Sequence, residues 1–202
     1  AGNVINNLKA LGAEVDVISV VSECNTSEEL KDLLRSIMVD TKHLITQKDR
    51  VTSKKSRIIA ANQQVIRYDR ESTDEINNNS QIAILEIFKA IVSNYDVILL
   101  SDYGKGLLTF DLTQSLIGIA NENKKKLLVD PKGIDYSKYK GAYLLTPNKK
   151  EASEATHSVI KDNESLTQAI KSLKEQCNLE VSLITLSEQG VAVFDNELRI
   201  HP

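Results

Sequence analysis

The sequence predicts an α/β fold in which helices flank a central, mostly parallel β-sheet. Three short apolar runs each end in a polar segment, and they cover residues 97–100, 127–129 and 143–145. Apolar runs without alternation are typical of strands covered on both faces, and helical stretches between them indicate right-handed crossovers. Because ligands bind beyond the carboxyl ends of the strands in such sheets, we expect the functional site there.

The composition excludes several classes of partner. The chain has 202 residues and a formal net charge of -3, from 25 basic and 28 acidic residues, so neither nucleic acid nor a membrane surface is expected as a partner. No apolar stretch approaches the ~20 residues of a membrane-spanning helix, and no signal peptide is present, so we expect a soluble cytoplasmic protein. Cys24 and Cys177 are isolated, and we expect two buried free thiols.

The first elements alternate between helix and strand. Apolar residues between positions 4 and 11 have helical spacing, and Gly12 suits a left-handed C-terminal cap. A strand is expected over 15–21, followed by a helix that starts with a capping box at 26–29 and ends near residue 38.

A β-hairpin interrupts this alternation between residues 41 and 74. Its strands are expected over 57–60 and 64–69, around a turn at 61–63. The segment concentrates positive charge, and its basic residues are Lys54, Lys55, Arg57, Arg67 and Arg70. Two interpretations remain open: a solvated edge hairpin, or a lid that meets an anionic substrate.

The remaining elements restore the alternation. After a loop at 77–79, Ser80 is predicted to cap a helix that ends near residue 93. The buried side of this helix is expected to consist of Ile82, Leu85, Ile87, Phe88 and Ile91. A helix over 163–177 precedes strands over 181–186, 191–194 and 198–200. No composition shift marks a boundary, so we treat residues 1–202 as part of one domain.

The polar segments after the strands contain residues that could bind a metal ion or a phosphate group. Asn148 and Glu151 lie three residues apart at a helix start, so they could hold a hydrated Mg²⁺ together or simply form a capping box. Gly190 allows either close approach of a ligand or a tight turn. Lys132 follows a strand and could meet a phosphate, although an exposed loop lysine is the commoner case. The same two interpretations apply to Asp102 and Lys105.

Several local motifs resemble those of a known family. Residues 1–4 resemble the end of the Gly-Gly-Ala-x-Asn-Val motif of the ribokinase-like PfkB sugar kinases. Thr146-Pro147-Asn148-x-x-Glu151 is similar to the Asn-x-x-Glu signature of that family, and Thr185-x-Ser187-x-x-Gly190 lies where its nucleotide loop is found. Residues 62–69, 100–106, 130–133 and 187–190 resemble in particular the bacterial heptose 7-phosphate kinases, which are often fused to an adenylyltransferase.

This resemblance implies a ribokinase-like fold with a small β-hairpin lid. It also implies that MgATP phosphorylates the anomeric hydroxyl of D-glycero-β-D-manno-heptose 7-phosphate for ADP-heptose and lipopolysaccharide synthesis, and that the lid forms a homodimer. The implied ATP-binding residues are Asn148, Lys149, Lys150, Glu151, Thr185, Ser187 and Gly190, with Mg²⁺ held through water by Asn148 and Glu151. The implied substrate-binding residues are Asn3, Arg57, Asn62, Gln63, Arg67, Asp102, Lys105, Asp130 and Lys132.

The sequence departs from the family pattern at both ends. The first strand of the family is missing before Ala1, and its Gly-Ala-Gly-Asp motif, which holds the catalytic aspartate, is not found before Pro202. We therefore expect the central part of a kinase domain, inactive when isolated, with the catalytic aspartate C-terminal to Pro202. Two alternatives are a PfkB kinase for another sugar phosphate and a non-catalytic nucleotide-binding or dimerisation module.

Overall fold

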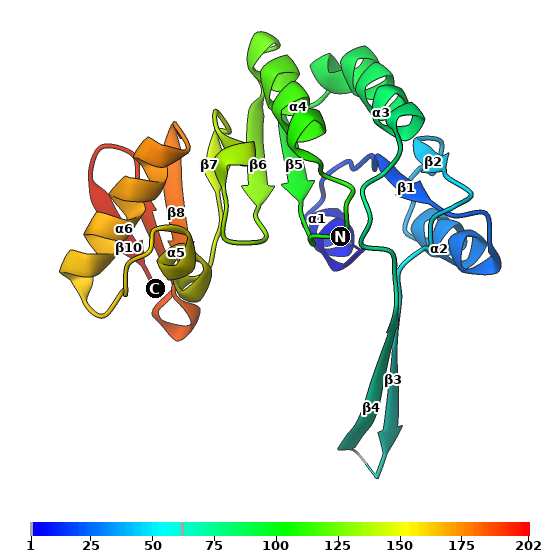
Figure 1. Ribbon diagram of the computed structural model, residues 1–202, viewed down its shortest axis with the longest axis horizontal. Helices are drawn as coiled ribbons and strands as arrows, with labels where there is room; N and C mark the ends of the chain where they lie inside the picture. Colours follow the sequence, from blue (N-terminus) through cyan, green and yellow to red (C-terminus); the bar gives the residue numbers. More distant parts are fainter. Residues whose placement is uncertain (1, 62) are drawn as a thin grey trace. The chain divides into compact units, whose positions relative to one another are not determined.

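The computed structural model describes residues 2–61 and 63–202, and these form two compact units. The first unit contains Ala1–Ile87 and Lys105–Leu107, and the second contains Phe88–Gly104 and Leu108–Pro202. Most helices and strands of both are labelled in Figure 1.

The first unit contains a small parallel sheet and helices. Strands β1 (Ser19–Val21) and β2 (Leu44–Thr46) pair in parallel, and helices α1 (Gly2–Ala10) and α2 (Asn25–Ser36) precede and follow β1. One cluster of buried apolar residues in this unit contains Ile5, Leu34 and Val39. Helix α3 (Asn78–Ile91) leads from the first unit into the second.

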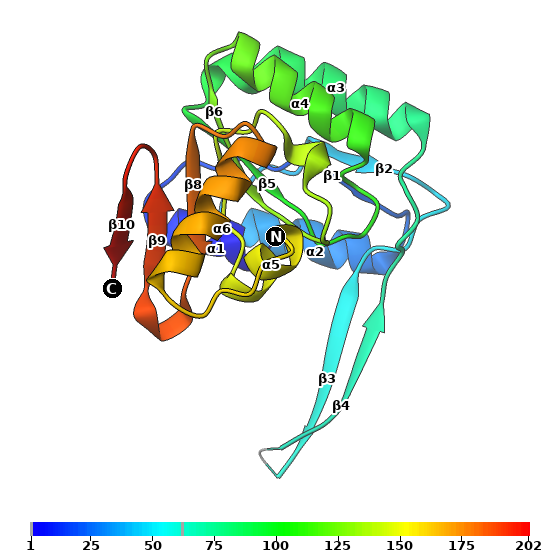
Figure 2. The same cartoon turned by 60° about the vertical axis from the view of Figure 1, so that its left-hand side comes forward.

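The predicted hairpin is confirmed, and it extends away from the rest of its unit (Figures 1 and 2). Strands β3 (Lys54–Ala60) and β4 (Gln63–Arg70) pair antiparallel, with a register irregularity between Ile58 and Ile59. Most described residues of both strands are exposed, because neither face of the hairpin packs against a core.

The second unit carries a six-stranded sheet in the order β10-β9-β8-β7-β6-β5. Its strands are β5 (Val97–Ser101), β6 (Lys126–Asp130), β7 (Leu144–Leu145), β8 (Val181–Thr185), β9 (Val191–Phe194) and β10 (Leu198–His201). The pairs from β5 to β8 are parallel, and the pairs from β8 to β10 are antiparallel. This arrangement confirms the predicted α/β fold with a mostly parallel sheet.

Helices cover this sheet and supply its core. They are α4 (Phe110–Glu122), α5 (Lys149–Ala155) and α6 (Asn163–Gln176), with the short 3₁₀ turns η1 (Val92–Asn94), η2 (Ser137–Tyr139) and η3 (Ser187–Gln189). Helix α4 packs against β6, and α6 packs against β8 and β9 (Figure 2). The largest fully buried apolar side chains of this unit include Leu112, Leu127, Leu145, Ile170, Leu173 and Ile184.

Strand β5 differs from the expectation of a strand covered on both faces. Val97 and Leu99 are exposed, whereas Leu100 is buried. Val97 and Leu99 point to the same face of the sheet, so this face lacks cover at β5, which is one of the two edge strands. In the inner strand β6, Leu127 and Val129 on one face are fully buried, whereas Leu128 on the other face is only partly buried.

The predicted details of helix α3 were partly wrong. Asn77, and not Ser80, caps the helix, because the Asn77 Oδ1 atom accepts the Ser80 backbone N–H at 2.8 Å. Ser80 is buried and donates its hydroxyl to Gln47 Oε1 at 3.0 Å. Ile82, predicted to be buried, is exposed, whereas Phe88 is buried as predicted. The buried stripe runs through Ile84 and Phe88, four residues apart.

The start of helix α2 corrects the predicted capping box and the predicted burial of Cys24. The helix begins at Asn25, so Cys24 occupies the N-cap position at the surface and its thiol is exposed. Ser27 faces inward instead of capping, and its hydroxyl bonds the Ser22 carbonyl at 2.6 Å and lies 2.8 Å from Thr52 Oγ1. Cys177, in contrast, is buried as predicted.

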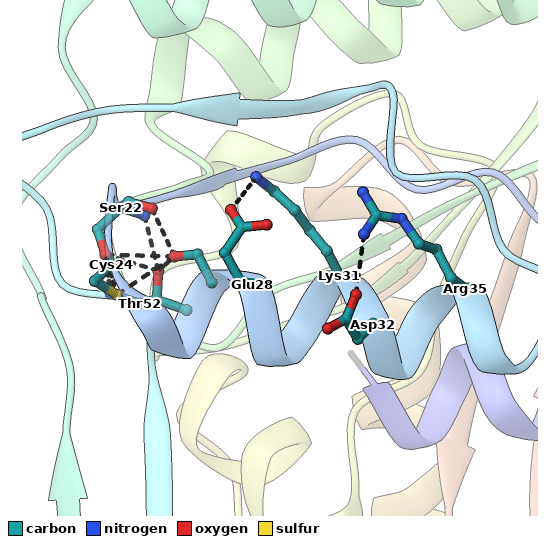
Figure 3. A network of polar contacts seen from close by, with 8 residues as sticks. Ser22, Cys24, Glu28, Lys31, Asp32, Arg35 and Thr52 are labelled. Carbon is teal, nitrogen blue, oxygen red and sulfur yellow. Dashed lines mark hydrogen bonds and ion pairs between the residues drawn. The ribbon is translucent and has the colours of Figure 1, made fainter.

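Figure 3 shows the polar cluster around this helix start. The Ser22 hydroxyl donates to Cys24 Sγ at 2.9 Å, and this bond, together with bonds from Ser27, lowers the pKa of Cys24 to about 6. The same cluster joins the end of β1 to the segment before β3, because the Ser22 backbone N–H donates to Thr52 Oγ1 at 2.8 Å.

Candidate active site

The first part of the site is the start of helix α5, where Asn148 and Glu151 form a capping box. Asn148 Oδ1 accepts the backbone N–H groups of Lys150 and Glu151, both at 2.9 Å, and Glu151 Oε2 accepts the Asn148 N–H at 3.1 Å. The capping interpretation is therefore confirmed. It uses only one Glu151 oxygen, and the other, Oε1, lies 3.4 Å from Lys132 Nζ.

The loop after β8 lies directly beside this helix start. Thr185 and Asn148 form a parallel bridge, and the Thr185 N–H donates to the Pro147 carbonyl at 2.9 Å. The structure thus brings together the two segments predicted to bind ATP, 146–151 and 185–190. A cavity of about 300 Å³ lies beside them, and its lining includes Lys149, Leu186 and Gln189.

The backbone of the β8–β9 loop is unusual at two positions. Ser187 has φ +55°, in the left-handed region, where the family resemblance leads one to expect glycine. Gly190 has φ +85°, and a Cβ atom there would lie 1.9 Å from the His201 carbonyl oxygen. Gly190 therefore satisfies the tight-turn interpretation, since no other residue fits against the end of β10.

The loop after β6 contributes a second charged group. Asp130 ends the strand, and burial, followed by the nearby carboxylate of Glu151, raises the pKa of Asp130. Lys132 is more than half exposed at its side chain, and its ammonium group is the one paired with Glu151. Asp130, Lys132, Glu151 and Thr185 thus lie at the carboxyl ends of the neighbouring strands β6, β7 and β8.

Asp102, at the end of β5, is held by protein groups on both oxygens. Its Oδ1 accepts the Gly104 N–H at 2.7 Å, and its Oδ2 accepts the Tyr139 hydroxyl at 2.7 Å and the Lys138 ammonium group at 2.6 Å. Its side chain is only 4% exposed. Substrate binding by Asp102 stays a prediction, and in this structure the carboxylate organises the loops.

Sequence reasoning did not single out Tyr139 or Lys138. Both lie in η2, inside the loop that follows the Asp130-Pro131-Lys132-Gly133 segment. Their contacts to Asp102 join positions more than 30 residues apart, so no local pattern could have indicated them. The nearest available signal is the placement of two aromatic residues, Tyr136 and Tyr139, three positions apart in the loop between β6 and β7.

The other residues predicted to bind the sugar phosphate belong to the first unit. Asn3 is an exposed residue of α1, and Arg57, Gln63 and Arg67 are exposed on the hairpin. Lys105 forms an ion pair with Glu71. Asn62 was also predicted to contact the sugar, and it lies outside the described residues.

Arg67 has a carboxylate partner on its own strand. Its Nε and Nη2 atoms donate to the two Asp69 oxygens at 2.9 and 2.6 Å. This pairing raises the pKa of Arg67 and lowers that of Asp69. Arg57 stands directly opposite Arg67 in the hairpin register.

The site suits a hydrated magnesium ion better than a bare metal. Within residues 2–61 and 63–202, no three histidine, cysteine or acidic side chains gather as metal ligands. Mg²⁺ keeps several waters and is usually held by one or two carboxylates together with substrate phosphates. Glu151, with one oxygen free of the capping box, fits such an ion, whereas the Asn148 carbonyl oxygen already accepts two backbone N–H groups, so a contact of Asn148 with the hydrated ion stays a prediction. In the described part of the chain no helix is both long and apolar enough to cross a membrane.

Comparison with known proteins decides the family. The family model described as pfkB family carbohydrate kinase matches residues 1–202. The chain belongs to the pfkB family. This pfkB chain is 60% identical over 202 residues to the "Bifunctional protein HldE" of Aliarcobacter butzleri and 53% identical over 201 residues to that of Sulfurimonas denitrificans. Each alignment spans 100% of this chain but only 42% of the length of the relative.

Solved structures confirm the ribokinase-like fold of this pfkB chain. A phosphofructokinase-2 mutant from Escherichia coli superposes with a TM-score of 0.78 at 18% identity, covering 99% of this chain and 66% of that one. An Arabidopsis thaliana ribokinase, solved with ribose and ATP, gives a TM-score of 0.73 at 13% identity, covering 96% and 62%. At such identities the likeness shows the fold alone.

Proposed function

We propose that this chain is the central part of an ATP-dependent kinase that phosphorylates the anomeric hydroxyl of D-glycero-β-D-manno-heptose 7-phosphate. The observation that carries the proposal is the grouping of Asn148, Glu151, Thr185 and Lys132 at the carboxyl ends of β6 to β8. Family membership supports kinase chemistry, and the motifs that resemble heptose 7-phosphate kinases support the sugar. The product would feed ADP-heptose synthesis in the cytoplasm.

The nucleotide is proposed to lie along the start of α5 and the β8–β9 loop. Its phosphates would face the residues from Asn148 to Glu151, with the exposed Lys149 and Lys150 as cationic partners. Thr185, Ser187 and Gly190 would line the other side. A bound Mg²⁺ would neutralise charge on the phosphate groups, held through water by Asn148 and Glu151. Phosphoryl transfer asks the protein mainly to position reactants and to stabilise charge.

The hairpin is proposed to recognise the 7-phosphate. Arg57 and Arg67 lie opposite each other, and like charges in directly opposed positions destabilise a sheet. Asp69 offsets part of this charge through its ion pair with Arg67. A bound anion would offset the remaining positive charge of the two arginines. This favours the interpretation of the hairpin as a lid over that of a solvated edge. Asn3, Gln63, Lys105, Asp130 and Lys132 are proposed as further contacts of the sugar phosphate.

A second copy of the chain is proposed to cover the apolar surface of the hairpin. Its exposed large apolar residues are Ile58, Ile59, Val65, Ile66 and Tyr68. Such a surface on a hairpin with an unpaired edge favours association. Sedimentation equilibrium of the full-length protein should give a dimer, and Ile66→Lys should give a monomer. A monomeric wild-type protein would contradict this part of the proposal.

The test of the proposed function compares substrates on the full-length protein. With saturating MgATP, heptose 7-phosphate should give the highest kcat/KM among heptose 7-phosphate, unphosphorylated heptose and fructose 6-phosphate. Loss of the 7-phosphate removes charge-assisted contacts, so kcat/KM should fall about ten- to a hundredfold. Preference for fructose 6-phosphate would support another PfkB sugar kinase. Absence of turnover with every sugar would favour a non-catalytic module.

A further inference from the structure

The hydroxyl of Tyr139 joins two loops that follow neighbouring strands of the sheet. Tyr139 has no exposed surface. Its hydroxyl donates to Asp102 Oδ2 at 2.7 Å and accepts the backbone N–H of Lys132 at 3.1 Å. Asp102 follows β5, and Lys132 lies in the loop after β6. One buried oxygen atom therefore fixes the Lys132 loop to the β5 loop.

The anchor at the other end of this bridge is rigid. Asp102 has a partner on each carboxylate oxygen besides Tyr139, namely Gly104 N–H and Lys138 Nζ. The Asp102 backbone N–H also donates to the Asp130 carbonyl at 3.0 Å, which ties the two strand ends together. Because the Asp102 carboxylate is enclosed in this way, the hydrogen bond from Tyr139 to it fixes the Lys132 backbone relative to the β5 loop.

The Lys132 side chain extends from this fixed backbone toward Glu151. A Cβ atom at Gly104 would lie 3.3 Å from Lys132 Cγ, so the lysine stem runs close to the Gly104 backbone. The ammonium group then lies 3.4 Å from Glu151 Oε1. Ordering a lysine side chain costs conformational entropy, and a fixed backbone reduces the number of positions that its ammonium group can sample.

We propose that Tyr139 is a positioning residue for phosphoryl transfer: its hydroxyl holds Lys132 so that the ammonium group stays beside Glu151, where the transferred phosphoryl group passes. This inference rests on the proposed kinase function. It adds to that function a residue that contacts neither substrate and acts through Lys132.

The chain offers a matched control for the hydroxyl. Tyr136 is 5% exposed, and its ring packs edge to face with that of Tyr139 at 5.7 Å between centroids. Among the described residues the Tyr136 hydroxyl has no hydrogen-bond partner. Burial raises the pKa of both tyrosines, so both hydroxyls are neutral at physiological pH. Tyr139→Phe and Tyr136→Phe each delete one buried hydroxyl, but only the first deletes the bridge.

The experiment measures kinetics and amide hydrogen exchange on the full-length wild type and both variants. Tyr139→Phe should lower kcat per folded molecule about tenfold or more and leave the KM for ATP within about twofold, because ATP binding does not depend on the bridge. Exchange at the Lys132 amide should become faster in Tyr139→Phe. Tyr136→Phe should match the wild type in kcat, both KM values and Lys132 exchange.

Each other outcome overturns a defined part of the proposal. Unchanged exchange at Lys132 in Tyr139→Phe would show that the bridge does not hold the loop. Faster exchange with a wild-type kcat, even with a lower thermal midpoint, would show a purely structural role. A wild-type protein that phosphorylates no sugar would overturn the proposed function itself, and the exchange data would still report whether the bridge exists.

Discussion

Replacing Glu151 by glutamine in the full-length protein should lower kcat about 10- to 100-fold while leaving the fold intact. Glutamine can still accept the Asn148 N–H, so the capping box at the start of α5 survives. The negative charge proposed to hold hydrated Mg²⁺ is lost. The ion pair with Lys132 is partly exposed, so its loss should change the free energy of unfolding by less than about 1 kcal/mol.

The control for this variant is Glu154→Gln on the same helix. Glu154 is exposed, and its ion pair with Lys150 spans 3.8 Å at the surface. The Glu154→Gln variant should keep the wild-type kcat, KM values and thermal midpoint. If Glu151→Gln instead lowers the midpoint severely and keeps normal activity per folded molecule, Glu151 is only a capping residue and the metal role is wrong.

Replacing Gly190 by alanine should be the most destabilising single change in the site. Gly190 has φ +85° and ψ -129°, a backbone conformation that residues with a side chain rarely adopt. The added Cβ would lie 1.9 Å from the His201 oxygen and 2.6 Å from Pro202 Cα. Backbone strain alone costs about 1–3 kcal/mol, and the overlap with backbone atoms adds to it. We expect a loss of at least about 3 kcal/mol, which lowers the midpoint by about 6–12 °C.

Gly12→Ala separates backbone strain from steric overlap. Gly12 also has φ +85°, but a Cβ atom there would meet nothing within 4 Å. Its cost should be about 1–2 kcal/mol, from the left-handed backbone alone. Differential scanning calorimetry of the full-length protein measures both variants. Equal midpoints for Gly190→Ala and Gly12→Ala would show that the contact between Gly190 and the end of β10 is absent.

Features that depend on neighbouring residues in the chain could be predicted from the sequence. The strands expected at 97–100, 127–129 and 143–145 follow from continuous apolar runs, and the sheet confirms each of them to within one residue at either end. The capping box of Asn148 and Glu151 spans one helical turn, so its spacing offered it as one of two interpretations, and the structure confirms it. Because these segments end parallel strands, the edge that carries the candidate site also followed from the sequence.

Features that depend on packing could not be predicted in the same way. Two side chains in one segment, Ser22 and Ser27, turn inward toward Thr52, and this arrangement leaves Cys24 at the surface. A helix cap can be supplied by either of two nearby polar residues, and only the structure selects Asn77 over Ser80. The Asp102–Tyr139 contact joins two loops, so it exists only once β5 and β6 have paired.

The phosphorus spectrum of the reaction product tests the central claim most directly. The full-length protein is incubated with MgATP and D-glycero-β-D-manno-heptose 7-phosphate, and the product is followed by ³¹P nuclear magnetic resonance. We predict one new phosphomonoester signal, coupled to the anomeric proton, that grows in step with ADP. A new phosphate on any other carbon, or ADP release without a new sugar phosphate, would contradict the proposed function.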